Sequence, residues 1–535
     1  MKLVTVSEMQ LIEKQAIDSG SSIESLMEKA GTGIANFIEK NFSCGKKVVT
    51  GLVGSGNNGG DVLVALEALA RNGWIAQVVL VRQREQKDPL LQCLLENGGQ
   101  VLTAKDSKDG SELKDWLENS TLLVDGVLGA GIKLPLKPEV AVVLGFIKKM
   151  KLNLPVIAVD CPSGVDMESG QAAPETIPAT ITLCMGAVKT GLMQFPAFAL
   201  AGELHVVDLG FSANLSAWQS SKSEVVTPEY VKSLLPVRAA TAHKGTFGTA
   251  LIVAGSTNYT GAALLSARAA YRVGAGLVRL AVPGPIYPAI AGHLPEATWV
   301  ILPHEQGVIH SDAASLIMKN LEKVTTMLLG PGWGREEITG EFLRELVFSN
   351  STSSRKGRIG FLEDGGNSGK IVKQLPPLVI DADGLNLLSE IESWSATLPE
   401  GTILTPHPGE MATLTGLAVD DIQQDRLGIA RKYSRAWNLV IVLKGALTVI
   451  AAPDGRIFLI PSATSALAKA GTGDVLSGMI TGLRAQGLGA VESAVCAAWI
   501  HAQAGLLAAD KVGDGAAVLA SDVIEAVAGV ISTLR

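Results

Sequence analysis

The chain has 535 residues, too many for one compact core, which predicts two large α/β domains or three to four smaller ones. Its 45 Lys and Arg residues against 52 Asp and Glu give a net charge of −7, so it lacks the basic field that non-specific nucleic-acid binding needs. Hydrophobic residues make up 47% of the chain and 58 residues are glycine, which argues against collagen, disorder and a disulfide scaffold.

The N-terminal segment does not have the pattern of a signal peptide, because Glu8, Glu13 and Lys14 interrupt it. No apolar run approaches the roughly 18 residues of a membrane span. The protein is therefore expected to have no membrane partner and to stay in the cytoplasm. The five cysteines are scattered without C-x-x-C spacing, so they are expected to be reduced and mostly buried.

The first predicted element is an amphipathic helix, in which apolar residues recur at three- and four-residue steps from Ile23 to Ile38. Ser21 and Glu24 have the spacing of a capping box at its start. Short β-rich runs then alternate with helical segments, which predicts a mostly parallel sheet covered on both faces. The strands are expected at 48–53, 76–81, 121–127, 155–160, 180–185 and 204–209, and the helices at 61–71, 89–97, 112–118 and 138–150.

A polar, serine-rich stretch at 212–224 interrupts this alternation and predicts a domain boundary, with one domain over 1–222 and another over 223–535. The second domain is also expected to be α/β. Its strands are predicted at 250–256, 277–282, 327–330, 378–383 and 439–445, with helices at the C-terminal end. Residues 349–370 are too polar and rich in Gly and Ser to bury, so a mobile surface insertion is expected there.

A glycine-rich turn follows the first strand of this alternating series and precedes a helix expected to begin near Asp61. Such a turn directs backbone N–H groups at one spot beside the positive end of a helix, which favours a phosphate. Residues 54–61 read GSGNNGGD, which is neither the dinucleotide fingerprint nor a P-loop. A structural turn needs only the glycines, whereas Asn57, Asn58 and Asp61 add polar groups that it does not require.

Two further strand ends carry polar residues: Asp125 ends one strand, and Asp160 ends another and is followed by Ser163. Ligands bind at the carboxyl ends of parallel strands, so these three residues and Asn58 are expected to converge on one crevice. The alternative is that the aspartates cap the following segments and that residues 162–164 form an ordinary turn. That alternative explains either aspartate alone better than it explains the set.

The segments 57–61, 124–131 and 160–164 resemble, in order and spacing, those of the NAD(P)H-hydrate epimerase (YjeF N-terminal) family over roughly residues 1–215. The resemblance implies a Rossmann-like three-layer domain that interconverts the R and S epimers of hydrated NADH and NADPH. It implies contacts to the hydrate from Asn57, Asn58, Gly59, Gly60, Asp61, Gly129, Ala130, Gly131, Ile132, Lys133, Leu134, Pro135 and Asp160.

The same resemblance implies a potassium ion held by Asn58, Asp125 and Ser163, and oxygen ligands suit such a hard cation. Two positions depart from the family, with Val62 in place of a glycine and Val165 in place of a tryptophan. Neither change removes a polar ligand, so a change of shape is expected rather than a loss of activity.

Epimerisation at a carbon that bears a hydroxyl beside a ring nitrogen can proceed by loss and re-addition of water, assisted by a group that transfers protons. Asp160 is the first candidate for that catalytic group, and Lys133 is the second. Lys133 can equally be a solvated loop lysine.

In the second half, residues 468–474 (AKAGTGD) precede a predicted helix over 475–484. Small residues with free N–H groups at a helix N-terminus form an anion hole. Asp474 at its lip can take the proton from a hydroxyl during phosphoryl transfer. An aspartate in the first helical turn is also common for dipole reasons alone.

Two other segments carry candidate ligands. Lys444 ends a predicted strand before a hairpin, and with the amides of residues 445–448 it can hold nucleotide phosphates or form a plain turn. His407 lies between two prolines, with Glu410 three residues on. A lone histidine is more often structural, but this rigid setting is that of a site residue.

Together with residues 243–245, 258–263, 329–334 and 381–386, these segments resemble the NAD(P)H-hydrate dehydratase family, which has a ribokinase-like α/β fold, over about 228–530. The insertion at 349–370 is atypical of that family. The resemblance implies Mg²⁺ and a nucleotide, ADP, bound by Lys444, Gly445, Ala446, Leu447, Thr448 and Gly473. It implies contacts to the hydrate from Ala262, Gly332, His407 and Asp474.

The chain is therefore interpreted as a bifunctional repair enzyme that acts on small molecules: NADH hydrate, NADPH hydrate and ADP. One domain epimerises the hydrate, and the other dehydrates its S form, releasing AMP and phosphate, with Asp474 as the base. A homo-oligomer is expected. One alternative makes the second domain a small-molecule kinase, and another makes the first domain a non-catalytic binding module.

Overall fold

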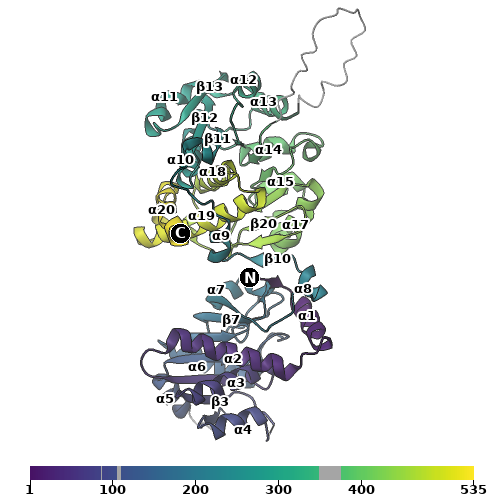
Figure 1. Ribbon diagram of the computed structural model, residues 1–535, viewed down its shortest axis with the longest axis vertical. Helices are drawn as coiled ribbons and strands as arrows, with labels where there is room; N and C mark the ends of the chain where they lie inside the picture. Colours follow the sequence, from purple (N-terminus) through teal and green to yellow (C-terminus); the bar gives the residue numbers. More distant parts are fainter. Residues whose placement is uncertain (86, 105–109, 349–374) are drawn as a thin grey trace, which may run out of the picture. The chain divides into compact units, whose positions relative to one another are not determined.

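The structure, a computed structural model, describes residues 1–85, 87–104, 110–348 and 375–535. It divides into two compact units, Met1–Ser223 and Glu224–Arg535 (Figure 1). The predicted insertion at 349–370 lies outside the described residues. Within the described ranges, no helix has the length and apolar character needed to cross a membrane.

The sheet of the first unit has seven parallel strands in the order β4-β3-β2-β5-β6-β7-β9. The order reverses between β2 and β5, and in such sheets a ligand crevice opens at that point, beyond the carboxyl ends of the strands. A short parallel pair, β1 with β8, stands apart from this sheet. The strands are β1 (Leu3–Val4), β2 (Val48–Val53), β3 (Ile75–Leu80), β4 (Gln100–Thr103), β5 (Leu122–Gly126), β6 (Val156–Val159), β7 (Ile181–Met185), β8 (Val188–Lys189) and β9 (Glu203–Val207).

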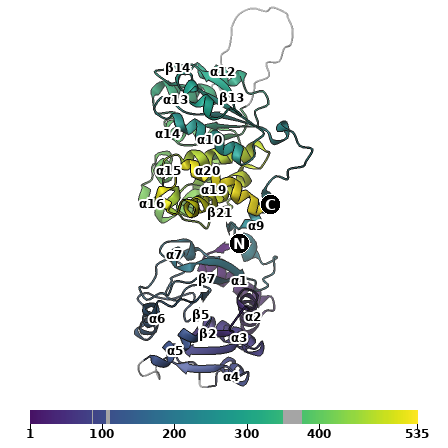
Figure 2. The ribbon, with the colours of Figure 1, turned by 90° about the vertical axis from the view of Figure 1, so that its left-hand side faces the viewer.

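Helices cover both faces of this sheet, because successive strand residues point to opposite sides. Val78 of β3 packs in a core cluster with α2 and α3, whereas its neighbour Val79 packs in a second cluster with α5 and α6 (Figure 2). The predicted Rossmann-like three-layer fold is thus confirmed. The helices are α1 (Val6–Asp18), α2 (Ile23–Phe42), α3 (Asn57–Arg71), α4 (Pro89–Glu96), α5 (Ser111–Asn119), α6 (Pro138–Met150), α7 (Ala197–Ala201) and α8 (Ser216–Ser220).

Three details at the start of the chain differ from the sequence-based expectations. Helix α1 was not predicted. The N-cap of α2 is Ser22, whose hydroxyl accepts a hydrogen bond from the N–H of Ser25, so the expected capping box of Ser21 with Glu24 is wrong. Helix α3 begins at Asn57 rather than near Asp61, because Gly56 serves as its N-cap. Asn58 therefore lies in the first helical turn.

The second unit contains a ten-stranded sheet in the order β10-β21-β20-β19-β18-β17-β16-β11-β12-β13. The strands from β19 to β13 are parallel, and β20 and β21 continue β19 as an antiparallel hairpin, as predicted. The bounds are β10 (Ser223–Val225), β11 (Thr249–Val253), β12 (Leu277–Pro283), β13 (Thr298–Leu302), β16 (Thr326–Leu329), β17 (Leu378–Ile380), β18 (Ile403–Leu404), β19 (Val440–Leu443), β20 (Val449–Ala451) and β21 (Ile457–Leu459), with a side ribbon of β14 (His304–Glu305) and β15 (Val308–Ile309).

Two buried clusters again lie on opposite faces of the sheet, one with α10, α18, α19 and α20 and the other with α12, α13 and α14. Helix α18 lies very close to α10, since a Cβ on Gly478 would come within 2.2 Å of the Ser266 carbonyl oxygen. The helices are α9 (Pro228–Leu234), α10 (Thr260–Arg272), α11 (Tyr287–Ile290), α12 (Ala313–Lys319), α13 (Glu337–Phe348), α14 (Asp383–Ser389), α15 (Pro408–Thr415), α16 (Val419–Gln424), α17 (Arg426–Trp437), α18 (Thr472–Ala485), α19 (Ala490–Val512) and α20 (Ala520–Leu534).

Candidate active sites

The first unit has a cavity of about 750 Å³ at the carboxyl ends of its strands. Most of the residues predicted to bind the hydrate line it: Asn57, Asn58, Asp61, Gly129, Ala130, Gly131, Ile132, Lys133 and Asp160. Four others do not. Leu134 and Pro135 are exposed beside the cavity, and Gly59 and Gly60 are buried in α3. A Cβ on Gly59 would come within 2.3 Å of the Gly54 carbonyl oxygen, so that glycine is required by close packing of the turn.

An arginine that sequence reasoning missed supports the glycine-rich turn from behind. The Arg84 guanidinium donates to the carbonyl oxygens of Gly54 (2.8 Å) and Gly56 (3.3 Å). It also pairs with Asp88 at 2.5 Å, and Asp88 caps the N-terminus of α4. Because Gly56 precedes the first turn of α3, these bonds hold the backbone that faces the cavity.

We expect Arg84→Ala to raise the KM for the hydrate about tenfold, because hydrogen bonds from a charged group contribute about 1.5–3 kcal/mol. The change in kcat should be smaller, since Arg84 does not line the cavity. Steady-state epimerisation kinetics measure both constants. Arg71→Ala is the matched control, because Arg71 forms an exposed ion pair at the other end of α3. An unchanged KM in Arg84→Ala would contradict the supporting role.

The three residues implied to hold potassium lie together around the backbone of Leu128. Ser163 donates from its hydroxyl to Asp125 Oδ1 (2.6 Å) and from its N–H to Oδ2 (2.8 Å). The N–H of Leu128 donates to the Ser163 hydroxyl (2.9 Å), and the Asn58 amide donates to the Leu128 carbonyl oxygen (3.2 Å). Burial raises the pKa of Asp125, which these hydrogen bonds oppose. The structure therefore gathers a carboxylate, a hydroxyl and a backbone carbonyl oxygen close together, with the Asn58 side-chain amide bonded to that carbonyl.

Asp160 has a buried partner, Lys189, that the sequence did not reveal. Lys189 Nζ lies 2.5 Å from Asp160 Oδ1 and donates to the Met185 carbonyl oxygen at 2.8 Å. Burial alone would lower the pKa of Lys189, but the Asp160 carboxylate outweighs it and raises that pKa. The partner is invisible in the sequence because it follows a different strand, 29 residues away. Lys133, the other catalytic candidate, is exposed at the cavity wall.

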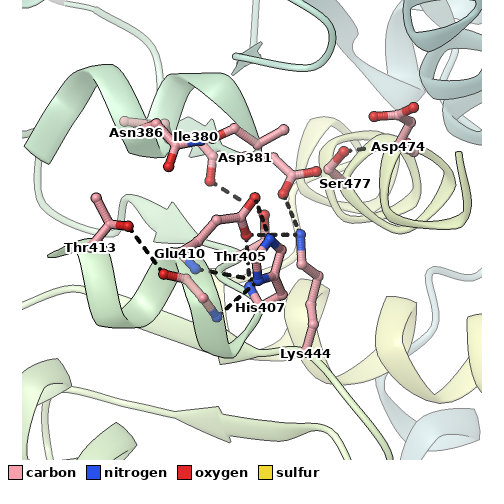
Figure 3. A network of polar contacts seen from close by, with 12 residues as sticks. Ile380, Asp381, Asn386, Thr405, His407, Glu410, Thr413, Lys444, Asp474 and Ser477 are labelled. Carbon is pink, nitrogen blue, oxygen red and sulfur yellow. Dashed lines mark hydrogen bonds and ion pairs between the residues drawn. The ribbon is translucent and has the colours of Figure 1, made fainter. Parts of the chain in front are cut away.

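In the second unit, polar residues at three neighbouring strand ends form one network (Figure 3). Asp381 follows β17, Glu410 lies in the first turn of α15 after β18, and Lys444 follows β19. Lys444 Nζ lies 2.7 Å from Asp381 Oδ1 and 3.5 Å from Glu410 Oε2. The other oxygen of Asp381, Oδ2, is buried without a hydrogen-bond partner among the described residues. Lys444 is thus already neutralised by two carboxylates.

His407 is the N-cap of α15, directly beside this network (Figure 3). Its Nδ1 accepts hydrogen bonds from the N–H groups of Gly409 (3.0 Å) and Glu410 (3.3 Å), which leaves Nε2 to carry a proton. Nε2 lies 3.5 Å from Glu410 Oε1, and the imidazole is half exposed. The ring therefore presents an oriented edge to solvent.

Asp474 lies in the first turn of α18, whose N-cap is Gly471. Burial raises the pKa of Asp474 to about 7, Asp381 adds to the rise, and Lys444 opposes it. A carboxylate with that pKa can accept a proton near neutral pH, which is what a general base requires.

Among the remaining predicted ligands of the second unit, Gly332 lies close to Ala262, and Gly473 lies close to Lys444. A Cβ on Gly332 would lie 2.7 Å from the Cβ of Ala262, and one on Gly473 would lie 3.7 Å from Lys444 Nζ. Residues 445–448 form the tight turn between β19 and β20, where the Thr448 hydroxyl donates to the Gly445 carbonyl oxygen (2.9 Å). The Leu447 N–H already donates to Ser462, so that amide is not free for a phosphate.

These two units define a fused pair of α/β enzymes. One has carboxylates and a glycine-rich turn around a cavity, and the other has a half-buried aspartate at a helix N-terminus beside a lysine–carboxylate network. Residues 23–191 match the family described as YjeF-related protein N-terminus, and residues 250–366 and 367–528 match the NAD(P)H-hydrate dehydratase family.

Two relatives match the chain along nearly their whole length. The chain is 35% identical over 545 residues to the bifunctional NAD(P)H-hydrate repair enzyme Nnr of Moorella thermoacetica, covering 100% of this chain and 97% of the relative. It is 33% identical to the enzyme of the same name from Thermofilum pendens, covering 96% and 93%. The chain belongs to the family of bifunctional NAD(P)H-hydrate repair enzymes.

Among solved structures, the ADP/ATP-dependent NAD(P)H-hydrate dehydratase from Bacillus subtilis, co-crystallised with ATP and Mg²⁺, is 30% identical. The match covers 58% of this chain and 98% of that one, with a TM-score of 0.47.

Proposed function

We propose that this chain restores NADH and NADPH from their hydrates in two steps. Residues 1–222 interconvert the R and S epimers, and residues 223–535 dehydrate the S epimer with ADP, giving AMP and phosphate. The observation that carries the second step is the half-buried Asp474 at the N-terminus of α18, whose carboxyl interacts electrostatically with Lys444 and Asp381. Hydroxide is a poor leaving group, and phosphorylation of the hydroxyl turns it into a good one.

In the dehydration step, Asp474 accepts the proton of the hydrate hydroxyl as its oxygen attacks the terminal phosphorus of ADP. The backbone N–H groups in the first turn of α18, including that of Gly473, face the transferred group. A helix N-terminus stabilises negative charge at this position. His407, Ala262 and Gly332 hold the nicotinamide part of the hydrate. Phosphate then leaves from the ring carbon, and loss of a ring proton restores the reduced nicotinamide.

Mg²⁺ in nucleotide sites is held by one or two carboxylates together with the phosphates, rather than by a protein cage. The second unit fits this requirement, because Asp381 Oδ2 is buried without a partner and Glu410 lies next to it. These two carboxylates would hold Mg²⁺, which neutralises phosphate charge when bound.

The oxygens around Leu128 likewise fit a potassium ion in the first unit, since Asn58, Asp125 and Ser163 converge there from α3, β5 and the segment after β6. When bound, the ion supplies positive charge beside the glycine-rich turn. The protein is further proposed to work in the cytoplasm as a homo-oligomer, which analytical ultracentrifugation of the full chain tests.

Dehydration should slow in acid, because Asp474 must be ionised to act as a base. With a pKa of about 7, the ionised fraction falls from about nine-tenths at pH 8 to about one-tenth at pH 6. We therefore expect kcat to drop about tenfold between those pH values. The measurement is initial rates with saturating S hydrate, with the non-enzymatic rate subtracted at each pH. A flat profile from pH 6 to pH 8 would show that another group is the base.

One experiment tests both activities. A mixture of R and S NADH hydrate is supplied with K⁺, Mg²⁺ and either ADP or ATP, and the return of nicotinamide absorbance is followed. Complete conversion is expected with ADP. If only the S portion is converted and the R portion disappears no faster than by spontaneous epimerisation, the epimerase activity is contradicted. No conversion at all would contradict the dehydratase activity. Accumulation of a stable phosphorylated compound would instead identify a kinase.

A further inference from the structure

Four ionisable side chains from four separate segments face the cavity of the first unit. Glu13 comes from α1, Asp61 from α3, Asp160 from the end of β6 and Lys189 from β8. The side chains of Asp61, Asp160 and Lys189 are buried, with residue exposures of 7%, 6% and 2%. Three carboxyl groups thus line the cavity together with Lys189, and Lys189 forms an ion pair with only one of them, Asp160.

The surroundings of the two buried aspartates differ. Asp160 Oδ1 accepts hydrogen bonds from Lys189 Nζ (2.5 Å) and from the Met185 N–H (3.0 Å). For Asp61, by contrast, no group of the described residues donates a hydrogen bond or forms an ion pair. Its carboxyl lies at the cavity wall in the second turn of α3.

The surroundings of Asp61 favour the protonated form of its carboxyl. Burial raises the pKa of Asp61 to about 8, Asp160 and Glu13 add to the rise, and Lys189 opposes it. Burial also raises the pKa of Glu13. Arg82, Lys133 and Lys137 are the other charged groups that line the cavity. Two carboxyl groups of one cavity, one paired with a lysine and the other without a partner among the described residues, are a suitable arrangement for a base and an acid.

We propose that Asp61 is a second catalytic residue of the epimerase: it gives a proton to the departing hydroxyl, while Asp160 takes a proton from the water that adds to the other face of the ring. This inference rests on the proposed epimerase function. Lys189 is a positioning residue that acts through Asp160.

The atoms and charges balance. As the carbon–oxygen bond breaks, its electron pair stays with the oxygen, which takes the Asp61 proton and leaves as water. The lone pair of the ring nitrogen forms a carbon–nitrogen double bond. A water oxygen then bonds to the same carbon from the other face, the double-bond pair returns to nitrogen, and Asp160 receives the proton. One water leaves and one enters, nothing is oxidised or reduced, and solvent returns the proton from Asp160 to Asp61.

The test uses the full chain, separated R hydrate, K⁺ and water enriched in ¹⁸O, without nucleotide. Chromatography gives the rate of epimer formation, and mass spectrometry gives the label in the product. In the wild type, we expect each epimerisation to introduce one ¹⁸O and the rate to fall as the pH rises through about 8. Asp61→Asn should slow epimerisation at least about 100-fold, and Asp61→Glu should retain part of the rate. Asp115→Asn, an exposed change on α5, is the matched control.

A wild-type rate in Asp61→Asn, retention of the original oxygen, or no alkaline decline in the wild type would each overturn the assignment. If Asp61→Asn does not fold, as judged by its thermal unfolding, the wild type and Asp61→Glu provide the test. The epimerisation rate of both must then fall at alkaline pH. A wild type that does not interconvert the epimers contradicts the proposed function itself, whereas a working wild type with an equally active Asp61→Asn contradicts this inference alone.

Discussion

Asp474→Asn is expected to lower the rate of dehydration about 10³-fold while leaving epimerisation unchanged. Asparagine keeps the size of the side chain but cannot accept the proton of the hydrate hydroxyl, so phosphoryl transfer loses its base. The return of nicotinamide absorbance with S hydrate and ADP measures the first activity, and chromatographic separation of the epimers measures the second.

The matched control is Asp420→Asn, which removes an exposed aspartate from the first turn of α16. If Asp474 served only the helix dipole, the two variants would both retain dehydratase activity and each would cost a few tenths of a kcal/mol of stability. Near-normal dehydration by Asp474→Asn would therefore refute its catalytic role. Parallel loss of both activities would point instead to unfolding of the chain.

Lys444→Met is expected to lower the free energy of unfolding of the second unit by about 3–5 kcal/mol, because it leaves Asp381 and Glu410 close together without their cation. Removing one partner of a buried ion pair costs far more than the pair itself contributes, since the remaining charge is uncompensated. Urea unfolding followed by tryptophan fluorescence measures the loss.

Two further variants separate this charge effect from the loss of the side chain. The double variant Lys444→Met, Asp381→Asn should recover a large part of the stability, because it removes one of the two unpaired charges. Lys232→Met, on an exposed position of α9, should change stability by less than about 0.5 kcal/mol. A Lys444→Met chain as stable as the wild type would show that the two carboxylates do not depend on this lysine.

The alternation of strands and helices was predictable from the sequence, because strand residues and amphipathic helices have distinct periods. The convergence of Asn58, Asp125 and Ser163 was also predictable, since residues at the carboxyl ends of neighbouring parallel strands lie at one edge of the sheet. The hairpin after Lys444 was also predicted from the sequence, and β20 and β21 form it. These are all consequences of local pattern and of the rules of parallel sheets.

Other features depended on partners that are distant in the sequence. Helix α3 begins at Asn57 because the turn before it packs closely and is held by Arg84, which no local signal indicated. Lys444 has two carboxylate partners, which come from other strand ends and which the sequence did not reveal. These contacts follow from strand order rather than from spacing along the chain.

The sequence by itself determined the two α/β domains, the glycine-rich turn and the identity of the polar residues at the strand ends. An acidic, glycine-rich chain was compatible with phosphate-bearing substrates, because backbone N–H groups can hold them without a basic surface. Only the tertiary structure decided which carboxyl group is neutralised and which is not. Protonation states depend on burial and on nearby charges, and for Asp61 and Asp474 those charges come from other elements of the fold.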